Sequence, residues 1–200
     1  CFHCPENNTV DGFHLPFIII IMSNILPAWR PLLKAARQRE RQASEARWLQ
    51  LSTVALDGTP RIRTLVFRNW VTATQFDLFS DQRSDKFNEL THRPDVELCW
   101  MLMKARQQFR MRGCVKLFAG EDSHEFRQKS WLQISPQGRS VWAWPHPGFP
   151  LQPDADFPEL VNDDVPMPEH FIVLRVMVFQ VEMLDLRPHP HQRIRWSAED

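Results

Sequence analysis

The sequence contains no tyrosine, and among its 200 residues only six are glycine and four are cysteine. Four cysteines are too few to support a disulfide-stabilised scaffold in a chain of this length. There is also no excess of charge, because 24 basic residues balance 24 acidic ones. Proteins that bind nucleic acids through phosphate contacts usually carry a basic excess or a basic stripe, so the neutral total argues against that class.

The first 21 residues lack lysine and arginine and end in the apolar run LPFIIII. This run is too short to cross a bilayer, and the segment lacks the basic region that opens a secretory signal. Cys1 and Cys4 have no second ligand pair at a zinc-binding spacing, so we predict no metal site. We expect Met22 to be the biological start and residues 1–21 to be a dispensable extension. Residues 22–200 are then one cytoplasmic domain with no membrane segment.

Hydrophobic residues make up 43% of the chain, including eight tryptophans and fourteen phenylalanines, which is enough for a substantial core. Apolar spacing predicts a helix from about Pro27 to Ala46, with Asn24 as its cap. Ser84 is expected to cap a short helix that ends before Pro94. A further helix is predicted over 122–133, and residues 135–168 are expected to be a long loop with short helical pieces.

The remaining apolar segments alternate with a period of two or are rich in β-branched residues, which predicts strands. The dipeptide Asp57-Gly58 is typical of the turn that joins the first two strands as a hairpin. Short connections and the lack of a regular βαβ order favour a mainly β, antiparallel small barrel with flanking helices. The predicted strands cover about 49–55, 60–70, 75–80, 96–103, 107–118 and 170–186, with a last one at RIRW (193–196).

The segment MKARQQFRMRG (103–113) places Lys104, Arg106, Gln108, Arg110 and Arg112 on one face of an expected strand. Such a row of cations could bind nucleic acid, be a solvated edge, or form one wall of a pocket for an anionic cofactor. The alternating residues alone leave these three interpretations open.

Four motifs in order resemble a known family. They are LSTVALDGTPRIRTLVFR, FDLFSDQRSDKFNELTHRPDVELCWM, RQQFRMRGCVKLF and the late PHPHQRIRW. Together they resemble the FMN-binding split-barrel proteins related to pyridoxamine 5'-phosphate oxidase, in the branch called pyridoxamine-phosphate-oxidase-like. The resemblance implies an antiparallel split β-barrel with FMN as its cofactor.

The resemblance implies that Arg63 and Lys86 hold the FMN phosphate. An arginine can grip a phosphate with two parallel hydrogen bonds, and a helix start beside a lysine favours an anion. Ser84 matches the family's Ser-x-Lys pattern at that helix start. The oxidase has a second basic residue where this chain has Asp85, so we expect Arg83 to compensate.

The same comparison implies contacts with the flavin ring. Gln108 would face the ring, where its amide can both donate and accept hydrogen bonds. Arg193 would be a late FMN-binding arginine, and four strand residues would lie beside the flavin: Leu65, Val66, Phe79 and Ser80. Arg110 and Arg112 have no firm family role and are candidates for dimer salt bridges or surface charge.

The substrate side matches the family less closely. Arg68 stands where the oxidase has a substrate-binding lysine, and the chain has no tyrosine for the Tyr-Arg-Ser set of the later helix. Arg139 and Ser140 are the candidates for the rest of that set, and His191 matches a substrate-side histidine. His189 stands where the oxidase would have an arginine.

The resemblance implies an FMN-dependent oxidoreductase that transfers hydride from a small-molecule substrate to FMN, with reoxidation by oxygen. It also implies a homodimer with FMN at the subunit interface. The alternative is a flavin- or haem-binding split-barrel protein without turnover. The chain ends at Asp200, four residues after Trp196. We therefore expect it either to be truncated at the C-terminus or to lack the family's final strand.

Overall fold

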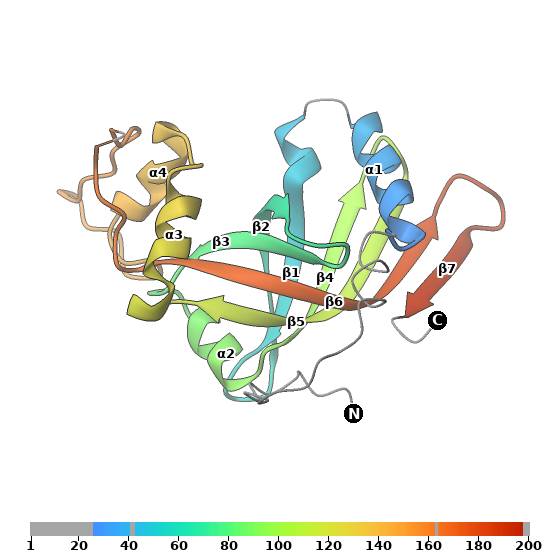
Figure 1. Cartoon of the computed structure of the whole chain (residues 1–200), viewed down its shortest axis with the longest axis horizontal. Helices are drawn as coiled ribbons and strands as arrows, with labels where there is room; N and C mark the ends of the chain where they lie inside the picture. Colours follow the sequence, from blue (N-terminus) through green and yellow to red (C-terminus); the bar gives the residue numbers. More distant parts are fainter. Residues whose placement is uncertain (1–25, 41–42, 163, 198–200) are drawn as a thin grey trace, which may run out of the picture.

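The computed structural model describes residues 26–40, 43–162 and 164–197. Within these ranges, seven antiparallel strands form one sheet in the order β3-β2-β1-β4-β5-β6-β7. Strand β3 also pairs with β6, which closes the first six strands into a barrel and leaves β7 outside it (Figure 1). The predicted antiparallel split barrel is confirmed. The strands are β1 (Trp48–Val54), β2 (Pro60–Trp70), β3 (Gln75–Asp81), β4 (Asp95–Leu102), β5 (Gln107–Phe118), β6 (Phe171–Asp185) and β7 (Gln192–Ser197).

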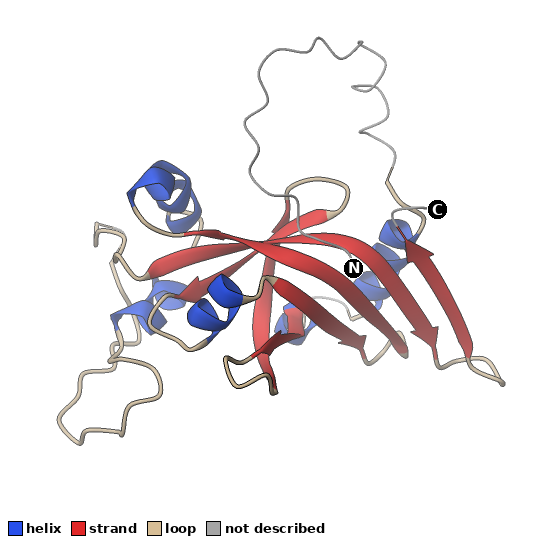
Figure 2. Cartoon of the chain, turned by 90° about the horizontal axis from the view of Figure 1, so that it is seen from below, coloured by secondary structure: helices blue, strands red, loops and turns tan. Residues whose placement is uncertain are grey.

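The helices lie outside the barrel, and Figure 2 shows them toward both ends of the strands and also beside their middle. Figure 1 places α1 toward the β7 end and α3 and α4 at the opposite end. Within the described ranges, no helix is both long enough and apolar enough to cross a membrane. The helices are α1 (Trp29–Arg39), α2 (Lys86–His92), α3 (His124–Trp131) and α4 (Pro136–Ala143), with short 3-10 turns η2 (Ser44–Arg47) and η3 (Glu121–Ser123).

The barrel core follows from strand alternation. In β5, Gln107, Phe109 and Met111 are buried, whereas Arg112 is exposed. Trp100 is fully buried, as are Phe109 and Met111. Each such side chain stabilises the fold by about 1.5–3 kcal/mol through removal from water. The expected hairpin turn is present: Gly58 has φ +81°, a conformation that glycine adopts at little cost.

A second apolar cluster attaches α3 and α4 to the barrel. The rings of Trp131 and Trp142 lie 5.7 Å apart, and each lies within 5.3 Å of the Phe171 ring in β6. The indole nitrogen of Trp142 donates a hydrogen bond to the Ser80 carbonyl at 3.0 Å. This anchoring fixes α4, and the loop that follows it, beside the end of β3.

Two predicted helix ends are wrong. The first helix ends at Arg39 rather than near Ala46, and Glu40 accepts hydrogen bonds from the backbone of Lys104 and Ala105 at 2.8 and 3.1 Å. Those bonds tie the helix end to the β4–β5 turn. The expected cap Asn24 lies outside the described residues.

Ser84 does not cap α2, because Asp85 occupies the N-cap position. The Ser84 hydroxyl instead donates to the Asp81 carbonyl at 2.6 Å, which closes the turn between β3 and α2. The predicted cationic face also begins later than expected. Met103–Arg106 form a turn in which Arg106 has φ +51°, so the alternation starts at Gln107.

Candidate functional site

A cavity of about 520 Å³, called here the β2–α4 cavity, lies between one side of the barrel and the segment after α4. Two groups of residues line it. The barrel side contributes Thr64, Leu65, Val66, Arg68, Phe79, Ser80, Asp81, Arg83, Ser84 and Lys86. The opposite side contributes Val141, Trp142, Trp144, Ala155, Phe157 and residues 145–152. The volume falls in the usual range for a small-molecule site.

The cationic end of the cavity is built around Lys86. Its ammonium group lies 2.5 Å from the Ser84 hydroxyl. Burial lowers the pKa of Lys86, and the nearby positive charge of Arg63 lowers that pKa further. Two cations held together in a partly dehydrated place favour an anion between or beside them.

Arg63 does not itself line the cavity, because its guanidinium points to α2. It donates to the Glu89 carboxylate at 2.6 Å and also to the Thr53 hydroxyl. Glu89 is buried, with 5% of its surface exposed. Arg63 therefore contributes positive charge near Lys86 while also compensating a buried carboxylate.

Two polar atoms at the cavity wall are buried and have no hydrogen-bond partner among the described residues. They are the Ser80 hydroxyl and the Nε of Arg68. The Arg68 guanidinium lies 4.9 Å from the Phe79 ring centre. Burial, followed by repulsion from Arg47, lowers the pKa of Arg68 to about 10. Buried polar groups normally have partners, so these two atoms are suited to contact a bound polar molecule.

Arg83 lines the cavity but its guanidinium is committed to the protein. It donates to both Asp81 carboxylate oxygens, the shortest bond being 2.7 Å. Two of its nitrogens donate to the Trp144 carbonyl, each at 3.2 Å. Although burial raises the pKa of Asp81, the hydrogen bonds from Arg83 hold it below its ordinary value. The Arg83 guanidinium thus holds the segment after α4 at the end of β3.

Gln108 and Arg193 lie elsewhere. Cross-strand pairing places Gln108 opposite Leu184 and Leu184 opposite Arg193, so the three share one face of β5, β6 and β7. Arg193 lies 3.5 Å from Glu182 rather than near the cavity. Neither Gln108 nor Arg193 lines the β2–α4 cavity.

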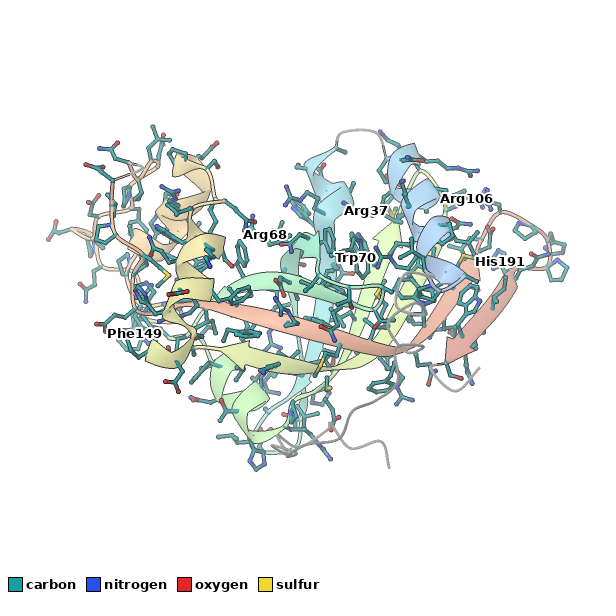
Figure 3. All side chains as sticks on the ribbon, in the orientation of Figure 1. Arg37, Arg68, Trp70, Arg106, Phe149 and His191 are labelled. Carbon is teal, nitrogen blue, oxygen red and sulfur yellow. The ribbon has the colours of Figure 1, made fainter. Side chains whose placement is uncertain are left out.

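Three of the four expected substrate residues also lie outside that cavity. His191 is exposed in the β6–β7 turn, and Figure 3 shows it at the opposite end of the molecule from the cavity residue Phe149. Arg139 is 2% exposed and donates to the Trp131 and Leu132 carbonyls at 3.4 and 3.5 Å. Ser140 is 4% exposed and donates to the Gln137 carbonyl at 2.8 Å.

Arg110 and Arg112 both have acidic partners within the chain. Arg110 donates to Glu182, and Arg112 lies 3.6 Å from Glu97. Among the described residues, no group of three or more His, Cys, Asp and Glu side chains is arranged to hold a metal ion.

The aromatic wall of the cavity was not predicted from the sequence. The stretch WAWPHPGFP (142–150) was expected only as part of a loop, yet it lines the cavity. Within it the His146 and Phe149 rings stack with centres 4.1 Å apart, and the Trp144 ring lies edge-on to Phe157 at 5.7 Å. The cluster of aromatic residues in an otherwise polar loop was the sequence feature that could have indicated this wall.

The fold and the cation-lined cavity define a split barrel suited to a flavin phosphate, and comparisons with known proteins agree. Residues 26–119 match the family model for the pyridoxamine 5'-phosphate oxidase FMN-binding domain. The chain is similar to pyridoxine/pyridoxamine 5'-phosphate oxidase 2 of Arabidopsis thaliana, with 28% identity over 88% of this chain and 91% of that protein.

Solved structures give the same result. A pyridoxamine 5'-phosphate oxidase-related, FMN-binding protein from Nostoc punctiforme PCC 73102 is 34% identical, with a TM-score of 0.79 over 86% of this chain and 92% of that one. PhzG from Burkholderia lata 383 shares the fold at 19% identity, with a TM-score of 0.63 over 90% of this chain and 85% of that one.

This chain belongs to the pyridoxamine 5'-phosphate oxidase-related family, and its cofactor is FMN. The residues present fit that cofactor, because the cavity joins a half-buried lysine to an apolar wall and to the Ser80 hydroxyl, which has no partner among the described residues.

Proposed function

We propose that this protein is an FMN-dependent oxidoreductase of the pyridoxamine 5'-phosphate oxidase type, with FMN held in the β2–α4 cavity. The observation that carries the proposal is that seven of the ten residues expected at FMN line this one cavity. They are Leu65, Val66, Phe79, Ser80, Arg83, Ser84 and Lys86. Bound FMN would supply the redox chemistry, because flavins accept hydride.

The chain's own residues have separate tasks in this proposal. Lys86 and Ser84 hold the phosphate, and Arg63, which does not line the cavity, adds positive charge near Lys86. Leu65 and Val66 provide the surface for the ring. The segment after α4, fastened by Arg83, covers the opposite side and keeps water from the reacting atoms.

Arg68 is the residue proposed to hold an anionic group of the substrate. Its guanidinium lies at the cavity wall with Nε unpartnered, and it remains protonated at neutral pH. Because Arg139 and Ser140 are occupied with main-chain carbonyls, Arg68 is the better supported of the three.

A homodimer is proposed for a second reason besides the family resemblance. Gln108 and Arg193 lie on the β5–β6–β7 face, away from the cavity that holds Lys86. If Lys86 contacts the same FMN molecule as Gln108 and Arg193, then Lys86 must come from one protomer and the other two residues from its partner. The site would then be complete only where the cavity of one protomer meets the β5–β7 face of its partner.

Flavin content and oxygen consumption test the function. We expect the purified protein to show flavin absorbance and to consume oxygen with pyridoxamine 5'-phosphate. A flavin-loaded protein that consumes no oxygen with this substrate or with pyridoxine 5'-phosphate would be a binder rather than this oxidase. A haem spectrum without flavin would contradict the proposal.

Complementation tests the shared site. Lys86→Gln and Gln108→Ala protomers should each bind FMN weakly alone. After mixed refolding, heterodimers should regain one intact site, made from the unmutated half of each protomer. Lys86→Gln mixed with Ser84→Ala is the matched control and should regain no site, because both substitutions lie in the cavity half. Failure of the mixture to regain FMN, with heterodimers present, would place all contacts within one protomer.

A further inference from the structure

A second cavity, called here the α1–β1 cavity, has a volume of about 550 Å³ and lies between α1, η2 and the start of β1. It shares one lining residue, Val66, with the β2–α4 cavity. Its lining contains three basic side chains and, among the described residues, no acidic one. The lining residues are Lys34, Arg37, Gln38, Ala43, Ser44, Ala46, Arg47, Trp48 and Val66.

Arg37 lines this cavity, and among the described residues no carboxylate forms an ion pair with it. Its guanidinium lies 4.7 Å from the Phe67 ring centre and 4.9 Å from that of Trp100, above the end of the barrel core. Its Nε is buried and has no hydrogen-bond partner among the described residues. Burial, followed by the charge of Arg47, lowers the pKa of Arg37. The negative charge of a bound anion would offset both effects.

Arg47 is held in place at the wall of the same cavity. Its Nε donates to the Phe67 carbonyl at 3.1 Å, which orients the guanidinium. Its neighbour Glu45 does not line the cavity and accepts a hydrogen bond from Ser44 at 3.1 Å. An oriented arginine beside a second arginine is well suited to charge-assisted hydrogen bonds with phosphate oxygens.

Trp48 supplies an aromatic surface next to these cations. It is 45% exposed, although tryptophan is usually among the more buried residues. An exposed indole beside arginines can stack on a planar ring whose phosphate the arginines hold.

We propose that the α1–β1 cavity binds a phosphate-bearing ring compound, with its phosphate on Lys34, Arg37 and Arg47 and its ring on Trp48. This site adjoins the flavin cavity through Val66, has its own basic residues, and does not depend on the proposed oxidase activity. Because Val66 belongs to both cavities, a molecule bound here would lie beside the flavin-binding strand β2.

Calorimetry on the FMN-loaded protein tests the site with three probes: phenyl phosphate, inorganic phosphate and phenol. We expect phenyl phosphate to bind one additional site per protomer more tightly than inorganic phosphate, both in the wild type and in Arg68→Gln, which removes the proposed substrate contact of the flavin cavity, and phenol to show no saturable binding. Arg47→Gln and Lys34→Gln should each weaken phenyl phosphate binding at least tenfold. Arg39→Gln, which removes an exposed arginine of α1 outside the cavity, should leave it unchanged.

Trp48→Ala separates the ring contact from the phosphate contact. It should abolish the advantage of phenyl phosphate over inorganic phosphate while leaving phosphate binding intact. Flavin absorbance, followed in the same titrations, should show FMN still bound. Unchanged affinity in both Arg47→Gln and Lys34→Gln, no binding of any probe, or release of FMN by phenyl phosphate would overturn the proposal. If the protein holds no flavin, the same titrations on the flavin-free chain still test whether the α1–β1 cavity binds phenyl phosphate.

Discussion

The Arg63 guanidinium lies 2.6 Å from the buried Glu89 carboxylate, so a strand arginine expected at the cofactor phosphate is already paired with a helix residue. The positive charge of Arg63 nevertheless reaches Lys86, whose pKa it lowers. The pair therefore links the stability of the β2–α2 contact to the charge of the proposed phosphate site.

Arg63→Gln should lower the free energy of unfolding by about 3 kcal/mol, because it leaves Glu89 as a buried, unpaired carboxylate. The double variant Arg63→Gln/Glu89→Gln should recover part of this loss, since no buried charge remains. We expect its FMN affinity to stay weak, because the positive charge is still missing. Urea denaturation and FMN titration measure the two effects, and a double variant with wild-type FMN affinity would show that Arg63 acts only through Glu89.

FMN affinity should fall as pH rises through the pKa of Lys86. The protonated ammonium is the form that attracts phosphate, and burial lowers its pKa below that of a free lysine. The loss should therefore begin at lower pH than for an exposed lysine, while bound phosphate moves it back upward. FMN titrations between about pH 7 and pH 10 check this. Lys86→Arg should bind FMN with a flatter pH profile.

Lys86→Gln should raise the Kd of FMN by about ten- to a hundredfold, since hydrogen bonds to charged groups contribute about 1.5–3 kcal/mol. Lys129→Gln, which alters an exposed lysine of α3, is the matched control and should leave the Kd unchanged. Equal Kd values for Lys86→Gln and the wild type would remove Lys86 from the phosphate site.

Arg83→Gln should loosen the segment after α4, because the bonds to the Trp144 carbonyl and to Asp81 are lost together. Hydrogen exchange should increase across residues 144–157 and stay unchanged in β5. Arg93→Gln, at an exposed arginine that pairs with exposed Asp95, is the control. Unaltered exchange in 144–157 would mean that other contacts hold this segment.

Gly113→Ala should destabilise the barrel by at least about 1–3 kcal/mol, the usual cost of overpacking. An added Cβ would lie 2.4 Å from the Met177 carbonyl oxygen, which belongs to the backbone of β6 and cannot move independently of the sheet. Lys116→Ala, at an exposed position of the same strand, should change the free energy of unfolding much less. Thermal and urea unfolding provide the measurement.

Several local features could be read from the sequence because they depend on neighbouring residues. The bounds of β2 and β5 agree with the predicted 60–70 and 107–118, since alternation and the Asp57-Gly58 turn are local signals. Helix ends were less predictable. Ser84 bonds back to Asp81 instead of capping α2, and Glu40 ends α1 through contacts with a turn 64 residues later.

The sequence by itself determined the alternation of the strands, the hairpin and the family resemblance, because these depend on residue order. Only the tertiary structure decided that β3 meets β6, that Arg83 fastens the Trp144 segment, and that Gln108 lies on a different face from Lys86. Those facts arise from contacts between residues far apart in the chain. Such contacts depend on barrel closure and side-chain packing, which no local pattern encodes.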